Sequence, residues 1–143
     1  MGIPRLDKLV SIGTLKTEPP AREELEGLLR SGRARLNDAE KATLSIESRF
    51  DLAYNAAHAF ALAALRAHGY RSENRYIVFQ ALQDTLGLTA AQWRVLDAAH
   101  RKRNLAEYEG DTDLDEATVE ALTRIARELE QRVGRLIARP EKP

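Results

Sequence analysis

The chain has no cysteine, and only three of its 143 residues are histidine. The lack of cysteine excludes disulfides, thiolate metal sites and thiol nucleophiles. The histidines do not show the spacing of a zinc motif, and the acidic residues do not form the pattern of a calcium-binding loop. We therefore expect no metal centre and no cofactor. A chain without cysteine also suits the reducing cytoplasm, where we expect the protein to be located.

Long apolar runs and an excess of charge are missing as well. No segment approaches the roughly 20 apolar residues of a membrane span, and the first residues lack the apolar core of a signal peptide. The 22 basic and 22 acidic residues cancel, so the chain as a whole has no general electrostatic attraction to nucleic acid or membrane. We expect no membrane contact, and any contact with nucleic acid has to be local.

What the sequence does contain is a helical hydrophobic period along almost its whole length, without the alternation that is typical of strands. Helices are predicted over residues 21–42, 45–69, 72–86, 89–110 and 113–138. The second is expected to be capped by Ser45, the fourth by a capping box of Thr89 and Gln92, and the fifth by a similar arrangement that begins at Asp113. The predicted fold class is all-α, a four- to five-helix up-and-down bundle at residues 21–138 with a short extra N-terminal helix. Residues 1–20 hold that helix and a proline-containing linker, and residues 139–143 are expected to form a disordered tail.

The second of the bundle helices, at residues 45–69, is apolar almost all round and rich in alanine. Such a helix is normally enclosed by others, so we place it at the centre of the bundle. Asp51, Asn55 and His58 form a polar stripe along it, at positions i, i+4 and i+7. The stripe is an internal hydrogen-bond network, a partly exposed edge of the helix, or the wall of a site that faces Arg103.

A second group of polar residues lies near the end of the next-to-last predicted helix. His100, Arg103 and Glu107 share one stripe of that helix. Asn104 lies at the border of the stripe, and Tyr108 lies about 140° round the helix from Arg103. One interpretation is a solvated basic turn close to a helix C-terminus. The other is that Arg103 and its neighbours bind a phosphate.

Three segments of the chain form a recognisable set. They are Tyr54-Asn-Ala-Ala-His-Ala-Phe-Ala-Leu-Ala-Ala-Leu65 before Gly69-Tyr70, then Arg75-Tyr-Ile-Val-Phe79, and finally Arg103-Asn-Leu-Ala-Glu-Tyr108. In their order and spacing they resemble the HEPN superfamily of small helical-bundle proteins. The resemblance implies a bundle that is often a homodimer, in which two copies of an Arg-x4-6-His motif form a metal-independent ribonuclease cleft. It also implies a toxin or defence component, with a nucleotidyltransferase-like antitoxin as a partner.

The chain departs from that motif at its last position. Arg103 and Asn104 match the start of the motif, but Tyr108 stands where the histidine belongs. Tyrosine, with a reference pKa of about 10, is a poor base, although it can donate a hydrogen bond. Loss of general acid–base catalysis lowers a rate by about 10²–10⁴-fold. The sequence therefore leaves open whether the protein is a ribonuclease.

The hypothesis drawn from these residues is a HEPN-like protein that binds RNA or nucleotide phosphate, with or without ribonuclease activity. The residues assigned to catalysis are Arg103, Asn104 and Tyr108. The residues assigned to binding are His100, Glu107, Asp51, Asn55 and His58. The alternative is a non-catalytic dimerisation or partner-binding module in which Arg103 pairs with Asp51 or Glu107. A helical DNA-binding regulator fits less well, because the net charge is zero and no basic recognition helix is evident.

Overall fold

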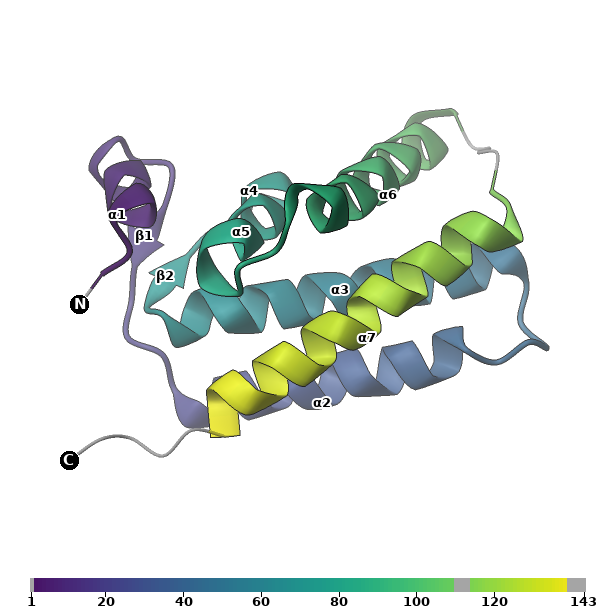
Figure 1. Ribbon diagram of the computed structural model, residues 1–143, viewed down its shortest axis with the longest axis horizontal. Coiled ribbons are helices and arrows are strands. Elements are labelled where there is room, and N and C mark those ends of the chain that lie inside the picture. The colour runs from purple at the N-terminus through teal and green to yellow at the C-terminus, as the bar shows by residue number, and fades with distance from the viewer. Residues whose placement is uncertain (1, 110–113, 139–143) are drawn as a thin grey trace.

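The computed structural model describes residues 2–109 and 114–138, with side chains described except at residues 106–109. The helices are α1 (Pro4–Ser11), α2 (Arg22–Ala39), α3 (Ile46–Ala67), α4 (Arg75–Gln80), α5 (Leu82–Thr85), α6 (Ala90–Glu109) and α7 (Glu116–Ala138). Two short strands, β1 (Lys16–Thr17) and β2 (Tyr70–Arg71), form a pair. The predicted all-α fold class is confirmed: the long helices pack as a bundle, and α1 lies at one end of it (Figure 1).

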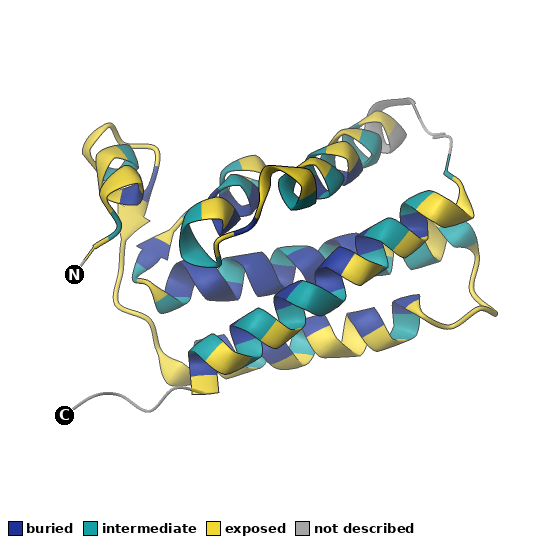
Figure 2. Cartoon of the chain, viewed as in Figure 1, coloured by how far each residue is buried: buried dark blue, intermediate teal, exposed yellow. Residues whose placement is uncertain are grey.

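The alanine-rich helix α3 lies at the centre of the bundle, as predicted. It packs against both α2 and α7 and is buried along most of its length (Figure 2). Its contact with α2 is close, because a Cβ atom added at Gly32 of α2 would lie 2.4 Å from Cε1 of Phe60 in α3. The Phe60 side chain is fully buried. The two helices therefore meet where a glycine makes room for an aromatic ring.

Three helices begin with the local hydrogen bonds that their sequences favour. Ser45 Oγ accepts from the backbone N–H of Ser48 at 3.1 Å, which caps α3 as predicted. At the start of α6, Thr89 and Gln92 form the predicted capping box, with hydrogen bonds of 3.2 and 3.0 Å. Asp115 Oδ1 accepts from the backbone N–H of Thr118 at the start of α7. The predicted capping role of Asp113 lies outside the described residues.

Two features differ from the prediction. The first is the strand pair, in which Lys16 lies opposite Arg71 and Thr17 opposite Tyr70. Two residues per strand are too few to show an alternating pattern, so the pair could not be predicted from the sequence. The second is that the single helix predicted over residues 72–86 is divided into α4 and α5. The carbonyl of Ala81 accepts from the backbone N–H groups three and four residues later, so the chain turns more tightly there.

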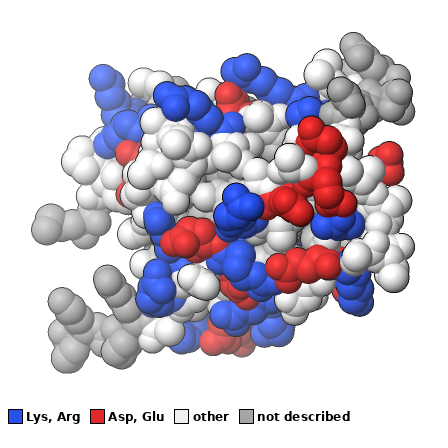
Figure 3. Space-filling view, turned by 45° about the vertical axis from the view of Figure 1, so that its right-hand side comes forward, with Lys and Arg blue, Asp and Glu red and all other residues white. Residues whose placement is uncertain are grey.

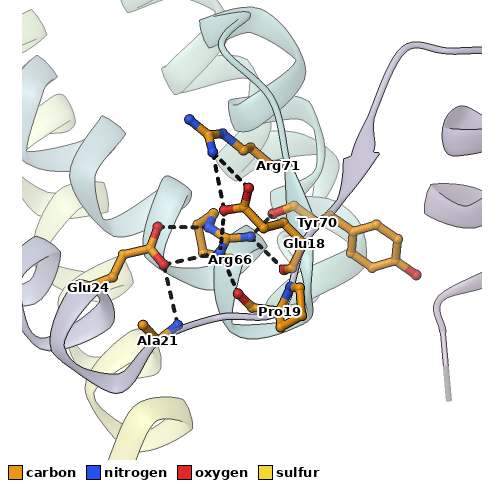
Figure 4. A network of polar contacts seen from close by, with 7 residues as sticks. All are labelled: Glu18, Pro19, Ala21, Glu24, Arg66, Tyr70 and Arg71. Atoms are coloured by element: carbon orange, nitrogen blue, oxygen red, sulfur yellow. Dashed lines mark hydrogen bonds and ion pairs between the residues drawn. The ribbon is translucent and has the colours of Figure 1, made fainter.

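A buried arginine ties the N-terminal segment to the bundle. Arg66, near the end of α3, is only 2% exposed, and its guanidinium donates to both carboxylate oxygens of Glu24 in α2 (Figure 4). It also donates to the main-chain carbonyls of Glu18, Pro19 and Tyr70 at 2.9, 3.1 and 3.2 Å. This arrangement, the Arg66 clamp, fixes the segment between β1 and α2 against the end of α3.

The first residues of the chain are fastened in a similar way. The Tyr70 hydroxyl accepts from the backbone N–H of Ile3 and donates to Asp7. Arg5 forms a forked ion pair with Asp84 in α5. Within residues 2–109 and 114–138, no helix has the length and apolar character needed to cross a lipid bilayer. The tail predicted at residues 139–143 lies outside the described residues.

Candidate functional site

Side chains from α3, α4 and α6 gather around the phenol of Tyr54, and we call this group the Tyr54 cluster. Its members are Tyr54, Asn55, His58, Arg75, Tyr76, Phe79, His100, Arg103 and Asn104. The three helices meet here because α4 crosses between α3 and α6 and packs on both. The cluster thus brings together polar residues that lie up to 50 positions apart in the chain.

Two arginines approach the same buried ring. The guanidinium carbon of Arg103 lies 5.0 Å from the centroid of the Tyr54 ring, and that of Arg75 lies 5.6 Å from it. Tyr54 is fully buried, whereas both arginines are half-buried and reach solvent. Burial raises the pKa of the Tyr54 phenol, and the charges of the two arginines oppose that rise. The phenol therefore stays protonated at neutral pH, and its ring attracts both cations.

His100 links the phenol to Asn104, at the start of the predicted motif. Its Nδ1 lies 3.0 Å from the Tyr54 hydroxyl, and its Nε2 lies 3.3 Å from the amide nitrogen of Asn104. In this orientation of the amide, Nε2 accepts, so the neutral ring carries its proton on Nδ1 and donates it to the phenol oxygen. Burial lowers the pKa of His100; Asp97 opposes that effect, and Arg103 and Arg75 reinforce it. At neutral pH the imidazole is uncharged, with both nitrogens in hydrogen bonds.

His58 is also held in its neutral form. Burial, together with the charges of Arg75 and Arg103, lowers its pKa to about 4. Its ring meets the edge of the Phe79 ring at 5.8 Å between centroids. Next to it, Asn55 accepts a hydrogen bond from Nη1 of Arg75 at 3.2 Å and donates to the main-chain carbonyl of Asp51. Asn55 therefore orients Arg75 within the cluster.

Comparisons with protein-family models, curated proteins and solved structures find no match to this chain. The resemblance to the HEPN superfamily accordingly stays a prediction made from the sequence. Among the described residues, no three histidine, aspartate or glutamate side chains come together as a metal-binding group. The evidence for a function is therefore the geometry and charge of the Tyr54 cluster itself.

Most of the residues selected from the sequence do lie together. The structure brings Arg103, Asn104, His100, Asn55 and His58 into the Tyr54 cluster. The polar stripe on α3 therefore approaches the two arginines through its last two members: Asn55 accepts a hydrogen bond from Arg75, and the charges of Arg75 and Arg103 both act on His58.

The other selected residues are placed differently. Asp51 is exposed and contributes its main-chain carbonyl, which accepts from Asn55, rather than a buried carboxylate. Glu107 and Tyr108 belong to the helical backbone of α6, but their side chains lie outside what the structure describes. Their predicted roles remain predictions.

Sequence reasoning missed four members of the cluster: Tyr54, Arg75, Tyr76 and Phe79. Tyr54 lies one turn before His58 on α3, so its position among polar residues was a signal that it faces them. Arg75 follows Asn74, whose side chain caps α4 by accepting from Ile77 at 3.1 Å. No pattern within α4 shows that Arg75 meets α3, because that contact depends on how the helices are packed.

Proposed function

We propose that the Tyr54 cluster binds RNA or nucleotide phosphate, with Arg75 and Arg103 as the groups that contact the anion. The observation that supports this proposal is the convergence of two guanidinium groups, from different helices, on one buried phenol. Guanidinium groups carry several N–H donors in a fixed plane, and this geometry matches the oxygens of a phosphate.

The surroundings of Arg75 also support an anionic ligand. Among the described residues, the partners of Arg75 are the neutral Asn55 and Tyr54, and no carboxylate pairs with it. His58 and His100 are neutral at pH 7 and do not compensate or add charge. Elsewhere, basic and acidic side chains are interspersed over the face shown in Figure 3. Attraction of an anion is thus a local property of the cluster, as the neutral composition requires.

The geometry favours binding over cleavage. Cleavage of RNA without a metal requires a group that accepts and donates protons near neutral pH. The pKa of His58 is about 4, which leaves it a weak base, and both nitrogens of His100 are already in hydrogen bonds. The assignment of Tyr108 to catalysis therefore stays a prediction from the sequence, to be tested in the same experiment as binding.

The test compares two arginines of the same helix. Arg103→Ala removes a proposed phosphate contact, whereas Arg101→Ala removes the same charge from a side chain that is 76% exposed and paired with Asp97 at 3.0 Å. A hydrogen bond to a charged group contributes about 1.5–3 kcal/mol, so Arg103→Ala should weaken binding of a labelled single-stranded RNA roughly 10- to 150-fold. Arg101→Ala should change it by less than about 2-fold.

Fluorescence anisotropy in EDTA measures binding, and a gel of the same samples measures cleavage. If both variants bind RNA as tightly as the wild type, the proposed site is wrong. If both lose affinity equally, the chain holds RNA by diffuse charge rather than through the cluster.

A partner-binding module is the second candidate, and one feature favours it. An apolar groove of about 340 Å³ runs between α6 and α7, with Val95 and Ala121 among its lining residues. A second hollow of about 290 Å³ shares those two residues. A second copy of the chain would bury this surface. If a second copy binds in this groove, sedimentation velocity should show a dimer for the wild type and a monomer for Val95→Glu. A monomeric wild type would exclude dimerisation through the groove.

A further inference from the structure

Tyr76 is the aromatic side chain of the cluster that faces solvent. It is 40% exposed, although the aromatic residue three positions later in α4, Phe79, is 1% exposed. The other large apolar side chains with comparable exposure among the described residues, Ile12, Leu44 and Leu105, are aliphatic. An exposed tyrosine at the edge of a cationic site needs an explanation that core packing does not supply.

Two aromatic rings of α6 contact the ring of Tyr76. Its ring meets that of Trp93 at 5.7 Å between centroids and an angle of 72°, and that of His100 at 6.1 Å and 50°. Because His100 is hydrogen-bonded to Tyr54, the exposed ring is connected through one side chain to the centre of the cluster. A ring that is braced on one side loses little freedom when a ligand stacks on the other.

The position of Tyr76 relative to the two arginines is the decisive feature. The ring of Tyr76 contacts that of His100, and the charges of Arg75 and Arg103 act on the same imidazole. His100 therefore joins the exposed aromatic ring to the two arginines in one site. Single-stranded nucleic acid offers the matching pair of features, an unpaired base and a phosphate close to it.

We propose that Tyr76 is a stacking platform for a nucleobase and that the ligand of the Tyr54 cluster is single-stranded RNA. This inference rests on the proposed function, since Arg75 and Arg103 hold the adjoining phosphates. It adds the class of ligand: a duplex, whose bases are stacked on one another, does not present a base to Tyr76. Stacking of a base on an aromatic side chain contributes about 1–3 kcal/mol, which corresponds to roughly 5- to 150-fold in affinity.

The chain carries its own reporter for this contact. Trp93 is the single tryptophan, and its ring touches that of Tyr76. Titration of the full chain with a short single-stranded RNA should therefore change the tryptophan fluorescence. The same RNA annealed to its complement should bind more weakly. Inorganic pyrophosphate supplies phosphates without a base, and it should bind through Arg75 and Arg103 alone.

Three variants at one position separate stacking from packing. Tyr76→Phe keeps the ring and should bind single-stranded RNA within about 2-fold of the wild type, because stacking does not use the hydroxyl. Tyr76→Ala and Tyr76→Leu should weaken it by the roughly 5- to 150-fold expected for one stacked base, without changing affinity for pyrophosphate. Leucine keeps apolar volume against Trp93, so this variant is informative even where alanine disturbs the fold.

Each result bears on one of the two proposals. If Tyr76→Leu binds single-stranded RNA like the wild type while Arg103→Ala does not, the stacking inference is overturned and the phosphate site stands. Equal affinity of the wild type for the duplex and the single strand also overturns it. If the wild type binds neither RNA nor pyrophosphate, the proposed function fails together with the inference.

Discussion

At the scale of single residues, the Tyr54 cluster changes the acid–base behaviour of its histidines. His58 of α3 lies against the ring of Phe79 and near the charges of Arg75 and Arg103. Burial, together with these two charges, lowers its pKa from 6.5 to about 4. The neutral form of this imidazole is favoured, because a third positive charge beside the two arginines would be poorly hydrated there. The same positive surroundings that suit a phosphate therefore disfavour a protonated histidine.

The lowered pKa of His58 predicts a loss of stability in acid. Between pH 6.5 and about 4 the unfolded chain takes up a proton on His58 that the folded chain does not, so unfolding becomes easier as the pH falls. Below about pH 4 both states are protonated and this effect stops growing. At about 1.4 kcal/mol per pKa unit, the free energy of unfolding should fall by at most about 3.5 kcal/mol.

Urea unfolding of the wild type and of His58→Gln, at several pH values, measures this contribution. Carboxylates and the other histidines also titrate in this range, so the difference between the two proteins is the relevant quantity. Glutamine does not titrate. As the pH falls from 6.5 to about 4, the free energy of unfolding should therefore fall more in the wild type than in the variant. Parallel pH profiles would show that His58 is not held neutral by folding.

At the scale of helices, contact between α2 and α3 depends on a missing side chain. Gly32 and Gly27 both lie inside α2, where replacing glycine with alanine normally stabilises a helix by about 1 kcal/mol. At Gly27 the nearest atom to an added Cβ is the flexible Nη2 of Arg30 at 3.8 Å. At Gly32 the added Cβ would overlap three ring atoms of the buried Phe60, at 2.4 to 2.9 Å.

The two glycines should consequently respond in opposite directions. Gly27→Ala should raise the free energy of unfolding by about 0.5–1 kcal/mol, and Gly32→Ala should lower it by about 1–3 kcal/mol, the usual cost of overpacking a core. Chemical denaturation of the two variants provides the measurement. Stabilisation by Gly32→Ala would mean that α2 and α3 are not packed as closely as described.

How far the sequence predicts the fold differs between local and distant contacts. The caps at Ser45 and at Thr89 with Gln92 were predictable because they join residues three positions apart. The central place of α3 followed from its apolar surface. The β1–β2 pair was missed because each strand has two residues, and its partners are over 50 positions apart. The break at Ala81 was missed because no glycine or proline marks it.

The candidate site shows the same limit. The stripe of His100 and Arg103 followed from the 100° turn of a helix, and the structure does place both in one cluster. Arg75 and Tyr76 were not selected, since their functional interest comes from contact with α3 and α6 rather than from any pattern in their own segment. Helical period predicts which residues share a face, but not which faces meet.

At the scale of the whole molecule, the Arg66 clamp joins the N-terminal segment to the bundle. Arg66 meets acceptors 42 to 48 positions away in Glu18, Pro19 and Glu24, and also the carbonyl of Tyr70 (Figure 4). Glu24 and Glu18 are partly exposed and would regain water without it, whereas the carbonyl of Tyr70 would lose a donor in a buried place. The carboxyl pKa of Glu24 is lowered, chiefly by the hydrogen bond from Arg66.

Replacement of Arg66 should lower the stability of the fold. Arg66→Met should lower the free energy of unfolding by about 2–4 kcal/mol, because it takes the donor from the buried carbonyl of Tyr70 and removes several charge-assisted hydrogen bonds at once. Arg71→Met is the matched control, since Arg71 also pairs with Glu18 but is half exposed; its loss should cost less than about 1 kcal/mol. Urea unfolding compares the two variants. Equal losses would indicate that the clamp contributes no more than a surface ion pair.

In the proposed complex, Arg75 and Arg103 together hold the phosphates of a bound RNA. The most direct test is the salt dependence of single-stranded RNA affinity in the wild type, Arg75→Ala, Arg103→Ala and Arg101→Ala. Each phosphate contact adds about 0.7 to the slope of log affinity against log salt concentration for a single strand. The slope should therefore fall by about 0.7 in Arg75→Ala and in Arg103→Ala and stay unchanged in Arg101→Ala. Four equal slopes, or a decrease in Arg101→Ala alone, would contradict the claim.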